Sequence, residues 1–193
     1  MIKKAVFLQS SPDLASCPLP TLPEFAFIGR SNVGKSSLIN MLTRHGNLAK
    51  VSSVPGKTRH IVFFTVDDSW RLVDLPGYGY AKASKEVKER FSKLCDDYFR
   101  SGRKISLVLH LIDIRHEPSA ADRSMIEFLN SAALPYFIVF TKCDKLSKMQ
   151  VRNHIAMMSK HLDFSEDAAD FAISSDKKEG IRELTDAITE FVF

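Results

Sequence analysis

The segment GRSNVGKS at residues 29–36 constrains this chain more than any other feature. It fits the pattern G-x-x-x-x-G-K-[S/T] at every fixed position. An apolar run typical of a buried strand, residues 25–28, precedes it, and a helix-forming run, residues 37–42, follows it. Glycine at both ends lets the chain fold back so that backbone N–H groups point toward an anion, and a helix N-terminus adds a partial positive charge. The sequence therefore predicts a phosphate-binding loop between a strand and a helix.

Each part of this loop has an expected task. We expect Lys35 to reach the β- and γ-phosphates of a nucleotide and to act catalytically by stabilising charge there, and the Ser36 hydroxyl to hold Mg²⁺. The predicted phosphate-binding residues are Gly29, Arg30, Ser31, Asn32, Val33, Gly34, Lys35, Ser36 and Ser37. The alternative, a glycine turn with a purely structural role, is disfavoured because strand, loop and helix occur in the required order.

Composition indicates a soluble, single-domain protein. A chain of 193 residues with 45% hydrophobic and 26% charged residues is ordinary for a globular domain. A net charge of +4 permits nucleic-acid binding without demonstrating it. No apolar run approaches the roughly 18 residues of a membrane span, and the 3 scattered cysteines indicate free thiols and argue against zinc. We expect a cytoplasmic monomer that does not associate with a membrane.

Strand-like and helix-like segments alternate along the chain. Strands are expected at residues 25–28, 61–66, 70–74, 105–114, 136–140 and 171–173, and helices at residues 37–42, 84–100, 119–130, 147–161 and 181–191. This alternation favours an α/β fold: a mainly parallel six-stranded sheet with one antiparallel edge strand and helices on both faces. Residues 1–24, which include a Pro- and Ser-rich lead-in, are expected to form an N-terminal extension packed on the main domain, residues 25–193.

Ligands of such sheets bind at the carboxyl ends of the strands, and further polar segments fall there. The D-x-x-G sequence Asp74, Leu75, Pro76 and Gly77 follows the strand at 70–74. We expect the Asp74 carboxylate to hold Mg²⁺ through water, as an outer-sphere ligand. The Gly77 N–H is expected to donate to a γ-phosphate, which makes it a catalytic candidate and this segment a nucleotide-sensitive switch, switch II.

A second switch, switch I, is expected ahead of the hairpin. Its predicted residues are Gly56, Lys57, Thr58, Arg59 and His60. Thr58 lies where a mobile threonine would coordinate Mg²⁺ and contact the γ-phosphate, and it is the third catalytic candidate. The alternative is a threonine that only shapes a turn; the length of the loop at 46–59 favours function.

The segment after the strand at 136–140 predicts a base-binding site. Guanine presents N1–H and a 2-amino group side by side, and the Asp144 carboxylate can accept both, whereas adenine lacks this pair. The aliphatic stem of Lys142 can lie along the base, and backbone N–H groups after the last strand can meet guanine O6. The predicted guanine-binding residues are Thr141, Lys142, Cys143, Asp144, Ile173, Ser174 and Ser175. The alternative is a solvated charged loop.

Taken together, GRSNVGKSSLIN, PGKT, DLPGYGYA, DIRH-x-P and TKCDKL resemble the EngB family (also called YihA or YsxC) of bacterial translation-factor-class GTPases. The resemblance implies a P-loop GTPase fold for residues 25–193, binding of GTP and GDP with Mg²⁺, and GTP hydrolysis. It also implies a nucleotide-dependent switch that acts in assembly of the large ribosomal subunit, contacts rRNA and ribosomal proteins, and is needed for normal cell division and septation.

Two residues depart from general GTPase patterns. Many such enzymes have Asn where this chain has Thr141, and threonine cannot supply the same carboxamide bridge to the phosphate loop; this argues against tight nucleotide affinity, although the narrower family usually shows threonine. Tyr78 stands where Ras-like enzymes place a water-orienting Gln. We therefore expect slow intrinsic turnover, at or below the order of 10⁻² s⁻¹.

Two further features each have two interpretations. Asn32 either coordinates a K⁺ ion near the phosphates, as the resemblance implies, or only shapes the turn. The basic residues Lys82, Lys85, Lys88, Arg90 and Lys93 form either an rRNA-facing patch or an ordinary solvated helix face.

Two rival functions remain open at this point. A P-loop phosphotransferase acting on a small metabolite would share the phosphate loop, but the position of TKCD argues against it. A nucleotide-gated binding module without functional hydrolysis would differ only in whether hydrolysis matters for cycling.

Overall fold

The computed structural model describes residues 2–50, 60–79, 84–162, 164 and 168–192. The strands are β1 (Ala5–Ser11), β2 (Glu24–Gly29), β3 (Ile61–Val66), β4 (Trp70–Asp74), β5 (Ile105–Asp113), β6 (Tyr136–Thr141) and β7 (Asp170–Ala172). The helices are α1 (Lys35–Leu42), α2 (Lys85–Arg100), α3 (Ala120–Ser131), α4 (Lys148–Leu162) and α5 (Ile181–Glu190), with a short 3₁₀ helix at Cys143–Lys145.

The strands form one mixed sheet in the order β1-β3-β4-β2-β5-β6-β7. Strands β4, β2, β5, β6 and β7 pair in parallel, and β3 is antiparallel to both β4 and β1. This confirms the predicted α/β fold with a mainly parallel sheet. The count of six strands was wrong, since the sheet described has 7 strands, and its antiparallel edge consists of two strands, β1 and β3, where one was expected.

The additional strand is β1, which comes from the N-terminal extension and pairs with β3 at the edge of the sheet. Three consecutive apolar side chains of β1, those of Val6, Phe7 and Leu8, are exposed. The strand therefore lacks the alternation that marks a half-buried strand in a sequence. Its partners in β3 lie 50 to 61 positions away in the chain. The backbone N–H groups of Lys3 and Lys4 also donate to the Asp67 carboxylate in the β3–β4 turn, at 3.0 and 2.7 Å.

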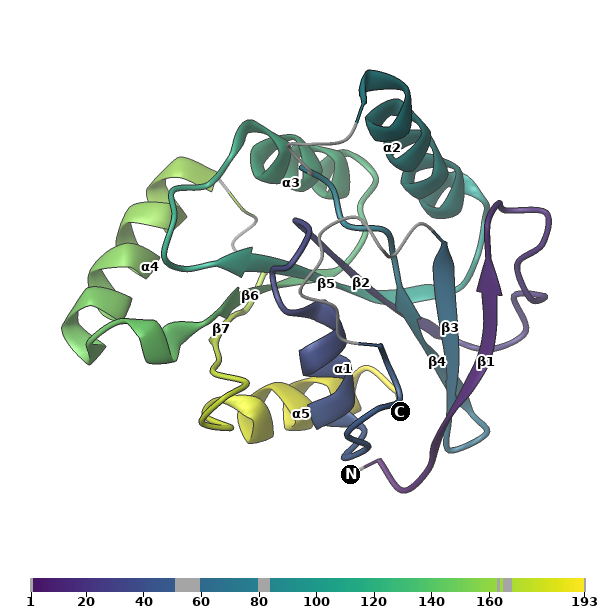
Figure 1. The fold of residues 1–193 in the computed structure, drawn as a ribbon, viewed down its shortest axis with the longest axis horizontal. Helices are drawn as coiled ribbons and strands as arrows, with labels where there is room; N and C mark the ends of the chain where they lie inside the picture. Colours follow the sequence, from purple (N-terminus) through teal and green to yellow (C-terminus); the bar gives the residue numbers. More distant parts are fainter. Residues whose placement is uncertain (1, 51–59, 80–83, 163, 165–167, 193) are drawn as a thin grey trace.

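Helices cover both faces of the sheet, as predicted (Figure 1). Helices α2, α3 and α4 pack on one face, and α1 and α5 pack on the other. Strand β2 shows the reason, because its side chains alternate between the two faces: Ala26 and Ile28 join the first core, and Phe25 and Phe27 join the second. A strand that is buried on both sides is apolar throughout, and this gave the sequence its continuous apolar run.

A buried ionic cluster closes the amino-terminal end of the parallel strands. The Glu24 carboxylate, fully buried at the start of β2, accepts hydrogen bonds from Arg71 at 3.2 Å, Arg103 at 2.7 and 2.8 Å, and Tyr98 at 2.9 Å. Arg71 and Arg103 also donate to the carbonyls of Leu19 and Pro18, at 2.6 and 2.7 Å. The cluster therefore ties the lead-in before β2 to the sheet, at the end opposite the predicted ligand site.

Helix boundaries agree with the local signals. Ser119 and Asp122 form the predicted capping box of α3, and Ser147 and Gln150 exchange the corresponding hydrogen bonds ahead of α4, at 2.9 and 3.3 Å. Helix α1 begins at Lys35, two residues earlier than expected. Among the described residues, no helix has the length and apolar character needed to cross a membrane.

Candidate nucleotide-binding site

The predicted phosphate loop joins β2 to α1 at the carboxyl edge of the sheet. Gly34 caps the N-terminus of α1 with a left-handed backbone, φ 117°, a conformation that residues with a Cβ rarely adopt. Asn32 also has a positive φ, 62°. The loop therefore folds back ahead of the helix, as an anion-binding loop requires, and the geometry of Asn32 agrees with a turn-shaping role.

Lys35, Ser36 and Asp74 meet at the base of this loop. Lys35 and Asp74 are both buried, with exposed fractions of 7% and 3%. Burial lowers the pKa of Lys35, against the attraction of Asp74, and burial raises the pKa of Asp74, against Lys35 and Ser36. Each charge is thus destabilised in the protein alone, and a bound phosphate and cation would stabilise both.

The same residues fit Mg²⁺. The Ser36 hydroxyl lies 3.4 Å from Asp74 Oδ2, and Asp74 Oδ1 is buried with no hydrogen-bond partner among the described residues. Hydroxyl and carboxylate oxygens are the ligand types that Mg²⁺ takes, together with water and substrate phosphates. The described residues hold no group of three or more His, Cys, Asp or Glu side chains that could bind a metal by themselves. A bound Mg²⁺ would therefore need the nucleotide as well as Ser36 and Asp74.

We expect Asp74→Asn to raise the Mg²⁺ concentration at the midpoint of Mg²⁺-dependent GTP binding, because a carboxylate that orients metal-bound water would be lost. Such partners are typically worth about 10- to 100-fold in metal affinity. The measurement is a Mg²⁺ titration of GTP binding, followed with a fluorescent analogue. In excess EDTA the parent and the variant should bind GDP alike; an unchanged Mg²⁺ midpoint would contradict the assignment.

The D-x-x-G segment lies against the phosphate loop. Leu75 N–H donates to the Phe27 carbonyl at 3.0 Å, Tyr78 N–H donates to the Gly29 carbonyl at 3.3 Å, and Ser31 N–H donates to the Tyr78 carbonyl at 2.9 Å. These bonds extend the parallel pairing of β2 and β4 beyond the ends of the strands. Gly77 is thereby placed beside Lys35, as its predicted contact with a γ-phosphate requires.

The predicted base-binding segment is tied to the same loop. The Thr141 hydroxyl donates to the Val33 carbonyl at 2.7 Å, and Lys142 Nζ donates to the Asn32 carbonyl at 2.8 Å. Threonine lacks the carboxamide that many GTPases use here, as stated above, but from the end of β6 its hydroxyl reaches the loop backbone and forms a bridge of its own. Two hydrogen bonds thus join the phosphate loop directly to the predicted base-binding segment.

Asp113, which we did not predict as a site residue, positions Lys142. Its carboxylate lies 2.9 Å from Lys142 Nζ and also accepts two bonds from the Arg115 side chain, at 2.9 and 2.8 Å. Burial opposes ionisation of Asp113, but hydrogen bonds from Arg115 and Lys142 outweigh it and hold the pKa of this carboxyl well below its ordinary value. The sequence signal that could have identified Asp113 as a site residue was its place at the carboxyl end of β5, in the DIRH segment.

Ser174 lies against Asp144, as their shared assignment to the base site predicts. Its hydroxyl donates to Asp144 Oδ1 at 2.8 Å, and Lys145 lies 2.7 Å from Oδ2. Ser174 N–H donates to the Glu179 carbonyl at 3.1 Å, so the expected contact of this amide with guanine O6 is not supported. The prediction of an O6 donor now rests on Ser175. Cys143 N–H donates to the Ile173 carbonyl at 3.1 Å, which joins the two halves of the base site.

Parts of the predicted switches and basic cluster lie outside the described residues. These are Gly56, Lys57, Thr58, Arg59 and Lys82, together with the side chains of Lys85 and Lys88. His60 is described and exposed, and its Nδ1 lies 3.1 Å from the Ser10 hydroxyl of β1. Arg90 and Lys93 are exposed on α2, where Lys93 pairs with Asp97 at 3.5 Å. The role of Thr58 as a Mg²⁺ ligand stays a prediction.

Comparison with known proteins agrees with this geometry. A family model described as "50S ribosome-binding GTPase" matches residues 24–142. The probable GTP-binding protein EngB of Flavobacterium johnsoniae is 46% identical over 98% of this chain and 91% of its own length. The protein of the same name from Porphyromonas gingivalis is 48% identical over 97% of this chain and 94% of its own length.

Solved structures show the same fold. A crystal structure of a probable GTP-binding protein engB matches with a TM-score of 0.73 and 26% identity, over 88% of this chain and 98% of that one. A variant of Era from Aquifex aeolicus, bound to GDP·AlF₄⁻, matches with a TM-score of 0.69 and 23% identity, over 87% of this chain and 56% of its own; at that identity the match concerns the fold alone. From the near full-length relatives and the family model, this chain belongs to the EngB family of P-loop GTPases.

Proposed function

We propose that the chain binds GTP and GDP with Mg²⁺, hydrolyses GTP slowly, and acts as a nucleotide-dependent switch in assembly of the large ribosomal subunit. One observation carries the nucleotide assignment. The bonds from Thr141 to Val33 and from Lys142 to Asn32 join a loop suited to phosphates with a segment suited to guanine. Two sites held at a fixed spacing favour a ligand that contains both groups, which is a guanosine nucleotide.

The proposed chemistry is attack of water on the γ-phosphate in line with the leaving oxygen. Lys35 and the backbone N–H groups of the loop stabilise the charge that develops on the phosphate oxygens. Gly77 N–H donates to the γ-phosphate, and Asp144 selects the base. Mg²⁺, held by Ser36 and through water by Asp74, would neutralise negative charge on the phosphates; Thr58 is proposed as its further ligand.

The slow rate has structural support in Tyr78. Its hydroxyl lies 2.6 Å from His110 Nε2 and 2.7 Å from Asp122 Oδ1, both in the protein interior. A phenol engaged in this way is not available to orient an attacking water, as a Gln does in Ras-like enzymes. We therefore propose an intrinsic rate at or below the order of 10⁻² s⁻¹.

We also assign residues 25–193 as the GTPase domain and residues 1–24 as its extension.

The family match supports a ribosomal role, since its description names binding to the 50S subunit. Exposed Arg90 and Lys93 on α2, close in sequence to the D-x-x-G segment, would suit contact with rRNA phosphates. We propose further that the protein is cytoplasmic and monomeric, and that loss of its function disturbs cell division and septation through ribosome assembly.

The test is a GTPase assay of the purified chain with and without large ribosomal subunits. We expect a slow basal rate and faster turnover with subunits, with subunit binding that weakens as salt rises. Equal rates in both conditions would favour a binding module without functional hydrolysis, and phosphate appearing on a metabolite would favour a phosphotransferase. Preference of the chain for ATP over GTP would reject the proposal.

The same assay tests the proposed K⁺ site at Asn32. If a K⁺ ion compensates for the missing Gln, GTP hydrolysis should be faster in KCl than in NaCl at equal ionic strength. An Asn32→Ala variant should lose this difference while it still binds GDP. Equal rates of the parent in the two salts would leave Asn32 as a turn residue only.

A further inference from the structure

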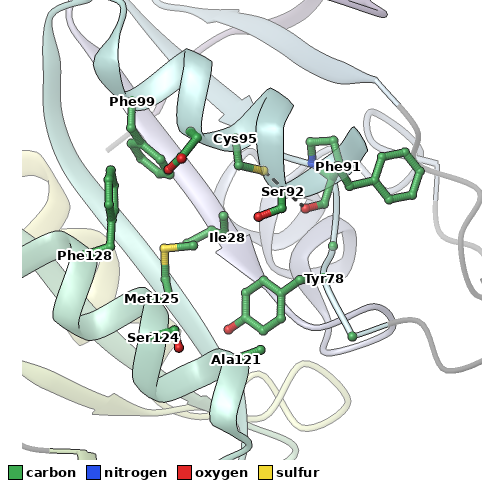
Figure 2. A pocket seen from close by; sticks show the side chains of 14 residues that line it. Ile28, Tyr78, Phe91, Ser92, Cys95, Phe99, Ala121, Ser124, Met125 and Phe128 are labelled. Atoms are coloured by element: carbon green, nitrogen blue, oxygen red, sulfur yellow. Dashed lines mark hydrogen bonds between the residues drawn. The ribbon is translucent and has the colours of Figure 1, made fainter. Parts of the chain in front are cut away.

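A buried chain of hydrogen bonds anchors the residue that follows the D-x-x-G segment. The Tyr78 hydroxyl lies 2.6 Å from Nε2 of His110 in β5 and donates to Oδ1 of Asp122 in α3 at 2.7 Å. His110 and Asp122 are buried, with exposed fractions of 0% and 1%. Figure 2 shows the phenol directed toward α3, near Ala121 and Ser124. The side chain directly after switch II therefore spans from the edge of the sheet to a neighbouring helix.

The chemistry of these groups fixes where the protons lie. Asp122 Oδ2 accepts bonds from the backbone N–H and the hydroxyl of Ser119, both at 2.7 Å, as a carboxylate would. Tyr78 then donates its proton to Oδ1, and His110 Nε2–H donates to the phenol oxygen. The remaining ring nitrogen, His110 Nδ1, is a bare lone pair, in agreement with its having no partner among the described residues. Burial lowers the pKa of His110 to about 4, so the imidazole is neutral at pH 7.

Backbone hydrogen bonds tie Tyr78 to the phosphate loop. Its N–H donates to the Gly29 carbonyl at 3.3 Å, and its carbonyl accepts from Ser31 N–H at 2.9 Å. Directly before it, Gly77 is packed so closely that a Cβ there would lie 2.9 Å from the Ser31 nitrogen and 3.0 Å from Lys35 Nζ. The position of Tyr78 thus determines the position of Gly77 relative to the ammonium that is expected to meet the γ-phosphate.

The Tyr78 ring packs against the buried core and also borders a cavity. The ring lines a cavity of about 530 Å³ between the D-x-x-G segment, α2 and α3, whose other walls include Phe91, Met125 and Phe128 (Figure 2). A side chain that borders open space has few contacts on that side, so its hydroxyl bonds carry more of the work of fixing it. Removal of the hydroxyl should therefore loosen the ring, and Gly77 with it.

We infer that Tyr78 is a positioning residue for GTP hydrolysis, which holds the Gly77 N–H toward the γ-phosphate through the bonds of its phenol to His110 and Asp122. The inference rests on the proposed function of the site. It predicts different effects for GTP and GDP, since GDP has no γ-phosphate to accept a hydrogen bond from Gly77. Loss of the anchor should therefore slow hydrolysis and leave GDP affinity almost unchanged.

Tyr78→Phe tests this, with Tyr98→Phe as a matched control. Tyr98 is also buried and also donates to a carboxylate, Glu24 Oε2 at 2.9 Å, but at the opposite end of the sheet. Both variants should unfold at a lower temperature. In single-turnover assays with saturating GTP, only Tyr78→Phe should slow hydrolysis, by about tenfold, the size expected from the loss of a net hydrogen bond. Its Kd for GDP should stay within about twofold of the parent.

Variants of His110 keep the test sharp if Tyr78→Phe folds poorly. His110→Gln can place an amide N–H near the lost Nε2–H and should retain most of the rate, whereas His110→Leu cannot and should behave as Tyr78→Phe does. The inference is overturned if Tyr78→Phe hydrolyses GTP as fast as the parent or faster, if Tyr98→Phe slows it equally, or if GDP affinity falls in step with the rate. A parent that hydrolyses no GTP would instead reject the proposed function.

Discussion

Replacing Asp144 by Asn should lower GTP affinity by roughly 10²- to 10³-fold and shift preference toward xanthosine triphosphate. A carboxylate that accepts from guanine N1–H and the 2-amino group makes two charge-assisted bonds, each worth about 1.5–3 kcal/mol. Xanthine carries a carbonyl oxygen in place of the 2-amino group, and the Asn amide can donate to it. The measurement is competitive displacement of a fluorescent GDP by GTP, XTP and ATP.

The structure makes this substitution a mild one for the fold. Ser174 Oγ donates to Asp144 Oδ1 at 2.8 Å, and an Asn oxygen can accept the same bond. Lys145, 2.7 Å from Asp144 Oδ2, keeps a second partner in Asp176 at 3.0 Å. The substituted side chain should therefore keep its position, and only the hydrogen-bonding group that faces the base should change.

Asp176→Asn is the matched control for this experiment. It removes the other carboxylate of the same lysine at an exposed position, where such pairs are worth about 1 kcal/mol or less. We expect GTP affinity to change by no more than a few-fold, with no gain for XTP. If Asp176→Asn and Asp144→Asn had equal effects, Asp144 would contribute only to local charge, and the assignment of the base site would be wrong.

The parts that the sequence predicts well are those with local chemical signals. The loop at 29–36 is a contiguous pattern, and a strand and a helix flank it because their own residues favour them. The sites at Asp74 and Asp144 follow from the rule that parallel strands end at one edge, so the order of the strands was enough to bring them together. A local pattern, serine followed three residues later by Asp or Gln, also located the capping boxes of α3 and α4.

The parts that it misses depend on partners far apart in the chain. His110 and Asp122 lie 32 and 44 positions from Tyr78, and nothing near Tyr78 in the sequence shows that it meets either of them. A histidine within the apolar run of β5 was a signal that a polar partner must exist, without naming it. Strand β1 was missed for the same reason, since its pairing with β3 cannot be read from its own residues.

The GTP site lies at one end of the sheet, and the Glu24 cluster secures the other. We expect Glu24→Gln to lower the free energy of unfolding by about 3–5 kcal/mol, the cost of removing one partner from a buried ion pair. Arg71 and Arg103 are nearly buried, with side-chain exposures of 8% and 5%, and share this one carboxylate. The neutral amide would leave two buried cations without a counter-charge, and it would also have to present an N–H where it now accepts. Urea unfolding at pH 7 measures the change.

Asp186→Asn provides the comparison for Glu24→Gln. It removes the acidic partner of Arg182 on α5, in a pair of 3.8 Å whose side chains are 91% and 71% exposed. Such a pair should contribute less than about 0.5 kcal/mol, because water screens it and two flexible side chains must be ordered to form it. GDP affinity measured in the native range should be unaffected by either variant, since the Glu24 cluster lies at the amino ends of the strands and the ligand site at their carboxyl ends. A loss below about 1 kcal/mol for Glu24→Gln would mean that the two arginines find sufficient partners in the carbonyls of Pro18 and Leu19, and that the lead-in rather than the carboxylate holds this end of the sheet.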